Sequence, residues 1–137
     1  MKNVCLVLLL VSACFPALCA QTPLETYSSS GNAFLRLCSP IDDDKATPGE
    51  QADVIGCAGF VSGFMVGVEA ETGLVKSKVG KKTPEMFCRP NNVEHGQVVR
   101  IVLKYIRSHP EEAHRVTELI MVSALGEAFP CKSCLGR

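Results

Sequence analysis

The chain alternates apolar stretches of helical length with short polar stretches rich in proline, and this pattern predicts helices. Residues 31–37 form a short apolar segment that ends near a cysteine, and residues 48–71 contain a long apolar run. Apolar positions recur at helical spacing over residues 93–107, and a fourth segment begins at Pro110 and ends before Pro130. No segment shows the period-two alternation of a strand. We therefore expect an all-α protein, a small bundle of about four helices.

Turn-forming residues place the expected helix ends. Ser39–Glu50 is rich in proline, glycine and aspartate, which argues for a loop. Thr47 is expected to be the N-cap of the second helix, with Pro48 at its first position. Asn91 or Asn92 is expected to cap the third helix. The predicted bundle therefore has loops before and after a long second helix.

The second predicted helix carries glycines at a regular spacing. Gly59, Gly63 and Gly67 are four residues apart and would form a smooth stripe along one face. Each glycine costs about 1 kcal/mol of helix propensity relative to alanine, which suggests that another backbone packs closely there. The apolar run at 54–68 is shorter than a membrane span, so we expect a buried central helix and no membrane span.

The N-terminal segment has the features of a secretory signal peptide. Lys2 supplies the positive start, Val4–Val11 is an unbroken apolar run, and small residues precede Gln21. We expect residues 1–20 to be cleaved as a signal peptide and residues 21–137 to form a single domain.

A second interpretation of the same segment is a bacterial lipoprotein signal. Val11-Ser12-Ala13-Cys14 resembles a lipoprotein box, in which Cys14 would carry a lipid anchor. The segment before Cys14 is unusually short for such a signal, which favours cleavage after Ala20.

The charge of the mature chain argues against nucleic acid as a partner. Removing Lys2 leaves 13 of the 14 basic residues against 14 acidic ones, a net charge of about −1. Such a chain has no broad positive field for nucleic acid or for an anionic membrane.

Five cysteines follow the expected cleavage site, and in an oxidising compartment they are expected to form disulfides. Four of them make two bonds in three possible connectivities, with one cysteine left over. The five residues are Cys38, Cys57, Cys88, Cys131 and Cys134.

The chain lacks recognisable catalytic and metal-binding motifs. The histidines at 95, 109 and 114 do not have the spacing of a helical metal pair, and Asp42–Asp44 lacks the glycine and distal glutamate of a calcium loop. No nucleophile elbow, phosphate loop or dinucleotide fingerprint is present. We therefore expect no enzyme activity, no catalytic residue, no cofactor and no metal.

Cys131 and Cys134 form a CxxC motif, which is typical of thiol redox proteins. In those proteins the first cysteine lies at a helix N-terminus, where the helix dipole favours the thiolate. Cys131 instead follows the C-terminus of a predicted helix, where the dipole has the opposite sign. A structural disulfide is the favoured interpretation, and a redox protein is the alternative.

Four lysines lie in the predicted loop Thr72–Glu85. Such a loop is either a solvated connector or a protruding basic binding loop. The lysines are Lys76, Lys78, Lys81 and Lys82.

Several short segments in a fixed order resemble the Rap/Tai family of immunity proteins, which act against type VI secretion amidase toxins. The resemblance extends over about residues 34–131. The segments are Cys57–Gly63, Phe87–Pro90, Gln97–Val99, Tyr105–Pro110 and Ala128–Cys131.

The resemblance implies a small disulfide-stapled helical protein, often a homodimer, that is exported to the periplasm. It implies inhibition by occlusion, in which a rigid part of the immunity protein plugs the cleft of a peptidoglycan amidase. From exposure and charge we expect the lysines named above, together with His109 and Glu112, to contact that effector. The alternatives are an envelope module with no toxin partner and a thiol redox protein that uses the C-terminal CxxC.

With this fold we expect disulfides between Cys38 and Cys57 and between Cys88 and Cys131. The first would join the first helix to the second. Antiparallel third and fourth helices would place Val93 and Phe129 at the same end of the bundle, which favours the second pair.

Overall fold

A computed structural model describes residues 27–79 and 85–131 of the protein. The described residues contain no strand, and the expected all-α fold is confirmed. The elements are α3 (Gly31–Cys38), the 3-10 helix η2 (Ser39–Asp42), α4 (Pro48–Val79), α5 (His95–Ser108), the 3-10 helix η3 (Pro110–Glu112) and α6 (Thr117–Ala128).

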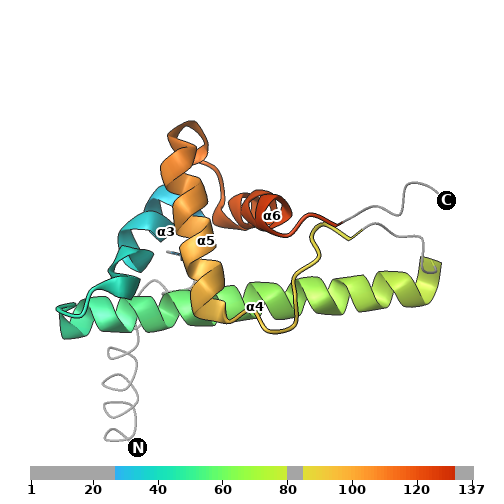
Figure 1. Ribbon diagram of the computed structural model, residues 1–137, viewed down its shortest axis with the longest axis horizontal. Helices are drawn as coiled ribbons and strands as arrows, with labels where there is room; N and C mark the ends of the chain where they lie inside the picture. The colour runs from blue at the N-terminus through green and yellow to red at the C-terminus, as the bar shows by residue number, and fades with distance from the viewer. Residues whose placement is uncertain (1–26, 80–84, 132–137) are drawn as a thin grey trace, which may run out of the picture.

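The long helix α4 forms one side of the molecule, and the shorter helices pack over part of its length (Figure 1). Helix α5 crosses α4 and contacts α3 and α6, and α3 also packs against α4. The C-terminal part of α4 extends well beyond α6 (Figure 1). The fold is therefore a compact group of helices from which one end of α4 projects.

The core lies where α3, α4, α5 and α6 meet. Phe34 is fully buried and its ring lies 6.2 Å from that of Phe60, between centroids. Because apolar area removed from water contributes about 25 cal/mol per Å², this cluster supplies most of the stabilisation of the bundle. The other large side chains that are fully buried include Val61, Leu103, Ile106, Ile120, Met121 and Leu125.

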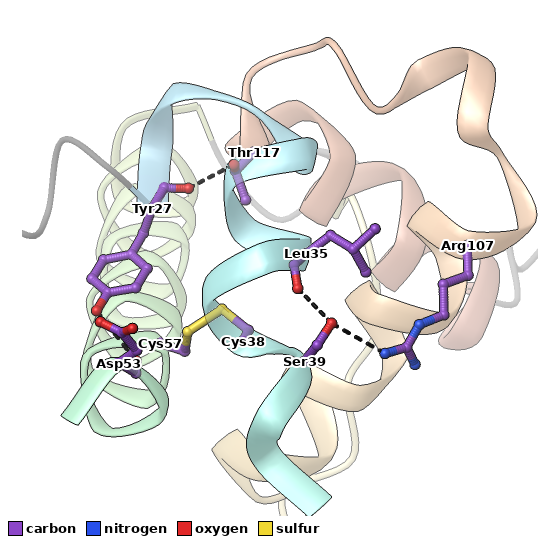
Figure 2. Close-up of a disulfide and its surroundings, with 8 residues drawn as sticks. All are labelled: Tyr27, Leu35, Cys38, Ser39, Asp53, Cys57, Arg107 and Thr117. Atoms are coloured by element: carbon purple, nitrogen blue, oxygen red, sulfur yellow. Dashed lines mark hydrogen bonds between the residues drawn. A yellow bond between two sulfur atoms is a disulfide. The ribbon is translucent and has the colours of Figure 1, made fainter. Parts of the chain in front are cut away.

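Two disulfides join elements that are distant in sequence, and they are the two pairs expected above. Cys38 at the end of α3 is bonded to Cys57 in α4, with a Cα–Cα distance of 5.8 Å (Figure 2). Cys88, in the segment before α5, is bonded to Cys131 just after α6. The first bond is buried in the core, since both cysteines are 0% exposed.

The start of α3 is held by the segment between α5 and α6. The backbone N–H groups of Gly31 and Asn32 donate to the carbonyls of Arg115 and Ala113 at 3.0 and 2.8 Å. Thr117 is the one buried polar side chain among the described residues, and its hydroxyl donates to the carbonyl of Tyr27 at 2.7 Å (Figure 2). These bonds satisfy polar groups that would be costly to bury unpaired.

Helix α4 begins with the cap expected from the sequence. The Glu50 N–H donates to Thr47 Oγ1 at 3.3 Å, and Glu50 Oε2 accepts the Thr47 N–H at 2.8 Å. This reciprocal pair is a capping box, which satisfies two backbone donors at the helix start. The hydrogen bond from the Thr47 hydroxyl, followed by that from its backbone N–H, holds the pKa of Glu50 below its ordinary value.

We expect Thr47→Ala to lower the free energy of unfolding by about 1 kcal/mol, since the cap oxygen is lost. Thr47→Ser keeps that oxygen, and serine ranks at least as high as threonine at an N-cap, so its free energy of unfolding should stay close to that of the unsubstituted protein. A group with a lowered pKa stabilises the fold at high pH, and this contribution is lost as pH falls through the lowered pKa. The difference in free energy of unfolding between Thr47→Ala and Thr47→Ser, measured by urea unfolding, should therefore be smaller in acid. Equal losses in both variants would contradict the capping role.

Three helix boundaries differ from the sequence-based expectations. Helix α4 continues to Val79, so the expectation of a loop from residue 72 is wrong for residues 72–79. Helix α5 begins at His95 with Glu94 at its N-cap, so the expectation of a cap at Asn91 or Asn92 is also wrong. Residues 72–79 contain no proline to stop the helix.

The fourth helix begins later than expected. Pro110 starts a 3-10 turn, and α6 begins only at Thr117. His109 leaves the helical conformation, with φ −128° and ψ 63°, and Val116 is extended, with φ −59° and ψ 138°. These two residues redirect the chain, so that α6 packs against α5 as a separate helix.

The glycine stripe of α4 does not pack against another backbone of the described chain. A Cβ built at Gly59, Gly63 or Gly67 would meet no atom within 4 Å, so that expectation is wrong. At Gly56, by contrast, a Cβ would collide with the Tyr27 side chain. Among these four glycines, Gly56 is therefore the one that another part of the described chain approaches closely, and that part is an aromatic ring.

Helix α4 is also much less buried than expected. Its residues Pro48–Lys78 are long and apolar enough to cross a membrane by length and composition, and their most apolar 18-residue window has a mean hydropathy of 1.4. Only 22% of its most apolar window is buried in the fold. Exposed apolar side chains occur along its length, at Ile55, Val66 and Leu74. The expected buried central helix is thus buried on one face only.

Candidate partner-binding surface

Residues 69–79 of α4 are called the projecting end below. This end is braced by the segment that leads back toward α5. Arg89 in this segment forms an ion pair with Glu69 of α4, with Nη2 and Oε1 2.7 Å apart. The other Arg89 nitrogen, Nη1, donates to the carbonyl of Val93 at 2.9 Å. A second ion pair joins Lys76 of α4 to Glu85. These two ion pairs therefore hold residues 85–93 beside the helix.

A groove of about 420 Å³ lies between α4 and residues 85–91. Met65, Val68 and Phe87 form its apolar lining, and the two ion pairs described above border it. Phe87 is itself 8% exposed and belongs to the core. The groove is thus continuous with the packed interior.

The Cys88–Cys131 disulfide ties this segment to the end of α6. The Cys88 N–H also donates to the carbonyl of Phe129 at 2.9 Å. We use the term strap for Cys88, Cys131 and the bond between them. The strap fixes the direction in which residues 85–91 leave the bundle.

Glu85, Cys88 and Cys131 have the side-chain chemistry of metal ligands, and their ligand atoms lie within 4.8 Å of one another. Zinc is bound by cysteine thiolates, however, and in the strap the two sulfurs are bonded to each other. In the disulfide state this group is therefore not a thiolate metal site.

Among the expected contact residues, Lys76 and Lys78 lie in the last turns of α4. Lys78 is exposed and lies near Leu74, whereas Lys76 is committed to the ion pair with Glu85. Lys81 and Lys82 lie outside the described residues. The expected basic loop is thus partly helical, and part of its charge is neutralised.

His109 directly follows α5, and Glu112 is the last residue of η3. This C-terminal end of α5 lies well away from the C-terminal end of α4 (Figure 1). The His109 ring stacks on Tyr105, with 4.2 Å between centroids, and its Nδ1 lies 3.1 Å from the Tyr105 carbonyl. Since a carbonyl only accepts, that nitrogen carries the hydrogen. Glu112 accepts from Arg115 Nη1 at 2.9 Å and from the Tyr105 hydroxyl at 3.2 Å. The structure does not bring these two residues together with the lysines.

Burial, followed by the hydrogen bond to Glu112, raises the pKa of Tyr105. The polar atoms of Tyr105, His109, Glu112 and Arg115 bond to one another at the C-terminus of α5. Its geometry is that of a helix end held in place. The role expected for His109 and Glu112 as effector contacts stays a prediction.

The acidic run Asp42–Asp44, which begins at the last residue of η2, also has a structural partner. Asp42 accepts a hydrogen bond from Arg100 of α5 at 2.8 Å, which holds the pKa of this carboxyl below its ordinary value. Asp43 accepts the backbone N–H of Lys45 at 2.9 Å. Asp42 thus joins this segment to α5, and Asp43 makes a hydrogen bond within the loop.

The exposed apolar side chains on α4 and just after it were not predicted from the sequence. Val66 and Leu74 are 61% and 62% exposed, and Met86 is 49% exposed. Apolar residues with a few charges beside them are typical of protein interfaces. The hydrophobic pattern could not show this, since Val66 would fit a buried helix equally well and Leu74 lies in the stretch expected to be a loop.

A family model described as Rap1a immunity proteins matches residues 30–131. The chain belongs to this family. The match begins at the cap of α3 and ends at Cys131, so it contains both disulfides. Comparisons with curated proteins and with solved structures find no significant similarity.

As a Rap1a family member, the chain is an immunity protein that acts against a secreted effector. This role requires binding to an effector, and the family points to a non-enzymatic protein. The two disulfides indicate an oxidising compartment, where such bonds form and persist.

Proposed function

We propose that this protein is exported to the periplasm, where it binds a peptidoglycan amidase delivered by type VI secretion and blocks its active site. Residues 1–20 would be the cleaved signal peptide and residues 21–137 the single mature domain. Membership of the Rap1a immunity family is the observation that carries this proposal. The two disulfides support the compartment, since they would be reduced in a cytosol.

The projecting end of α4 is the part we propose as the plug. It extends beyond α6 (Figure 1) and presents Leu74 and Lys78 to solvent. Ordering a mobile segment on binding costs affinity, so a plug works best when it is rigid beforehand. Ion pairs from Lys76 and Arg89, and the strap behind them, provide that rigidity. A helix end of this kind can enter a cleft and exclude substrate without reacting.

The homodimer implied by the resemblance is part of the proposal. The surface we suggest for it is the exposed middle of α4, where Gly59 and Gly63 leave room for the backbone of a second copy. Light scattering of the purified protein should give twice the mass of one chain. Gly63→Glu, which places a charge on this surface, should give a monomer. A variant that stays dimeric would place the interface elsewhere.

A titration of a type VI peptidoglycan amidase with the purified protein tests the main proposal. Amidase activity should fall linearly to zero at one immunity chain per enzyme. It should not fall with a reduced and alkylated sample, because that sample has lost its cross-links. Activity that survives a tenfold excess over every such amidase tested would contradict the proposal. Hydrolysis of peptidoglycan by the protein alone would also contradict it.

A further inference from the structure

The strap has a carboxylate beside it. Glu85 Oε2 lies 3.2 Å from Cys88 Sγ, and the ligand atoms of Glu85, Cys88 and Cys131 all lie within 4.8 Å of one another. The ligand atoms around a tetrahedral zinc ion are about 3.5–3.8 Å apart. Once the bond between the two sulfurs is opened, rotation of the cysteine side chains between staggered rotamers is enough to reach that separation. The three groups therefore lie close to where the ligands of one ion would be.

Contacts other than the disulfide hold the two cysteines near each other. The Cys88 N–H donates to the carbonyl of Phe129 at 2.9 Å, two residues before Cys131. Arg89, the next residue after Cys88, pairs with Glu69 of α4 at 2.7 Å. Opening the disulfide leaves these contacts in place, so both thiols would stay beside the carboxylate. A site that is held in this way loses little conformational entropy when an ion binds.

The Glu85 carboxylate is itself held in position by Lys76. Lys76 Nζ pairs with Oε1 of Glu85, whereas Oε2 faces Cys88 Sγ. Outer contacts of this kind fix the direction of a metal ligand. Two thiolates and one carboxylate bring three negative charges, and a divalent cation together with the lysine balances them. Without a cation, the same thiolates would repel each other and the carboxylate.

The two disulfides differ sharply in their access to solvent. Cys38 and Cys57 are both 0% exposed and lie in the core. Cys88 is exposed and Cys131 is half-buried. Reduction of a disulfide requires a reductant to reach one of its sulfurs. The strap can therefore be reduced while the core bond stays intact, and an ion can reach the reduced strap from solvent.

We propose that Glu85, Cys88 and Cys131 bind a Zn²⁺ ion when the strap is reduced, so that the strap is closed either by a disulfide or by the ion. A dithiol, the class of reductant to which reduced CxxC proteins belong, opens the bond. Its two electrons and two protons pass to Cys88 and Cys131, and its own sulfurs become a disulfide. Zn²⁺ then displaces the two thiol protons, which go to water.

The ligand set selects the metal. Thiolates favour zinc over magnesium and calcium, which prefer oxygen ligands. A water molecule would complete the tetrahedron as the fourth ligand. Because the ion joins the same two sulfurs, residues 85–91 would stay attached to the end of α6 under reducing conditions. This site goes beyond the proposed function and does not depend on which effector is bound.

The first test measures metal binding in the two states of the strap. The exported chain carrying Cys134→Ser, which removes a cysteine outside the described residues, is treated with a phosphine reductant under native conditions and desalted without oxygen. Alkylation and peptide mapping should find thiols at Cys88 and Cys131 and an intact Cys38–Cys57 bond. Competition with a chromophoric chelator should give one Zn²⁺ per chain, and Co²⁺ should give thiolate-to-metal charge-transfer absorption.

The oxidised sample should bind Zn²⁺ at least about 100-fold more weakly than the reduced one, because it has no thiolates. Zn²⁺ should also raise the melting temperature of the reduced sample and not that of the oxidised one. Reduced protein that binds no Zn²⁺, or binds it no more tightly than the oxidised protein, would overturn the proposal. Zn²⁺ binding that is lost through Cys134→Ser alone would overturn it as well.

The second test asks whether the carboxylate is a ligand. Glu85→Gln keeps both thiols and should weaken Zn²⁺ binding to the reduced strap roughly tenfold. Glu71→Gln is the matched control, since Glu71 is an exposed glutamate of α4 that lies beside Leu74 and Lys78 and does not line the groove. It should leave the affinity unchanged. Equal affinities in the two variants would remove Glu85 from the ligand set and overturn the site as proposed.

Discussion

Phe34→Ala is expected to lower the free energy of unfolding by about 4 kcal/mol, the loss typical of a large aromatic side chain removed from a core. Phe34 is 0% exposed and packs against Phe60 of α4. Its removal leaves a cavity where α3 meets the bundle, and the Cys38–Cys57 bond limits how far α3 can move to fill it. Since a domain of this size has a total stability of about 5–15 kcal/mol, the variant should be close to unfolding at 37 °C.

Urea unfolding followed by circular dichroism, with the disulfides intact, measures this effect. Phe64→Ala is the matched control, since Phe64 is a half-buried phenylalanine of α4 at the edge of the same core. It should cost less than half as much as Phe34→Ala, because less apolar area returns to water. Equal losses from the two substitutions would show that burial at α3 is not what stabilises the bundle.

The fold class was predictable because the helical period is strong in this sequence. Val98, Val99, Val102 and Ile106 recur at spacings that place them on one face of α5, and all four are buried. Turn signals were less reliable. Thr47 does cap α4, with Glu50 completing the capping box, but the asparagines before α5 do not cap it. Strong periodicity is thus a safer guide than single cap residues.

The projecting end of α4 could not be predicted from local pattern. Gly73 and the lysines around it fit a loop as well as a helix, and no proline decides the matter. The helix is braced by partners from the segment after it: Glu85 pairs with Lys76, and Arg89 pairs with Glu69. Contacts between segments that are apart in sequence override weak local preference. For the same reason, the groove beside α4 had no signal in the sequence.

The glycine stripe shows a different limit. Small residues at every fourth position indicate that a helix can be approached closely, but not what approaches it. In the described chain only Gly56 has such a neighbour, the Tyr27 ring. The other glycines of this stripe have no such neighbour in the described chain. The sequence could not show this, because the same glycine spacing also fits a buried helix. A pattern of residue types thus defines a surface and not its partner.

Leu74→Asp is expected to weaken effector binding by about 100-fold under the proposed function. Leu74 is 62% exposed near the projecting end of α4, where a cleft would bury it. A central apolar anchor at an interface is worth about 2–4 kcal/mol, and each 1.4 kcal/mol is a tenfold change in affinity. A carboxylate at this position would also have to be desolvated in the interface, which adds to the loss. Isothermal titration calorimetry against the amidase measures the effect.

The matched control is Ile55→Asp on the same helix. Ile55 is 73% exposed and lies 19 residues from Leu74, which is about 28 Å along an α-helix. The substitution changes charge and shape in a similar way, so both variants should keep the helical spectrum and similar stability. Ile55 lies one turn before Gly59, beside the surface suggested for the homodimer, so the mass of Ile55→Asp is measured first and affinities are compared per chain. On that basis Ile55→Asp should change the affinity for the effector by less than about threefold, as is usual for surface positions outside an interface. If Ile55→Asp weakens binding and Leu74→Asp does not, the effector contacts the opposite end of α4 and the proposed plug is wrong.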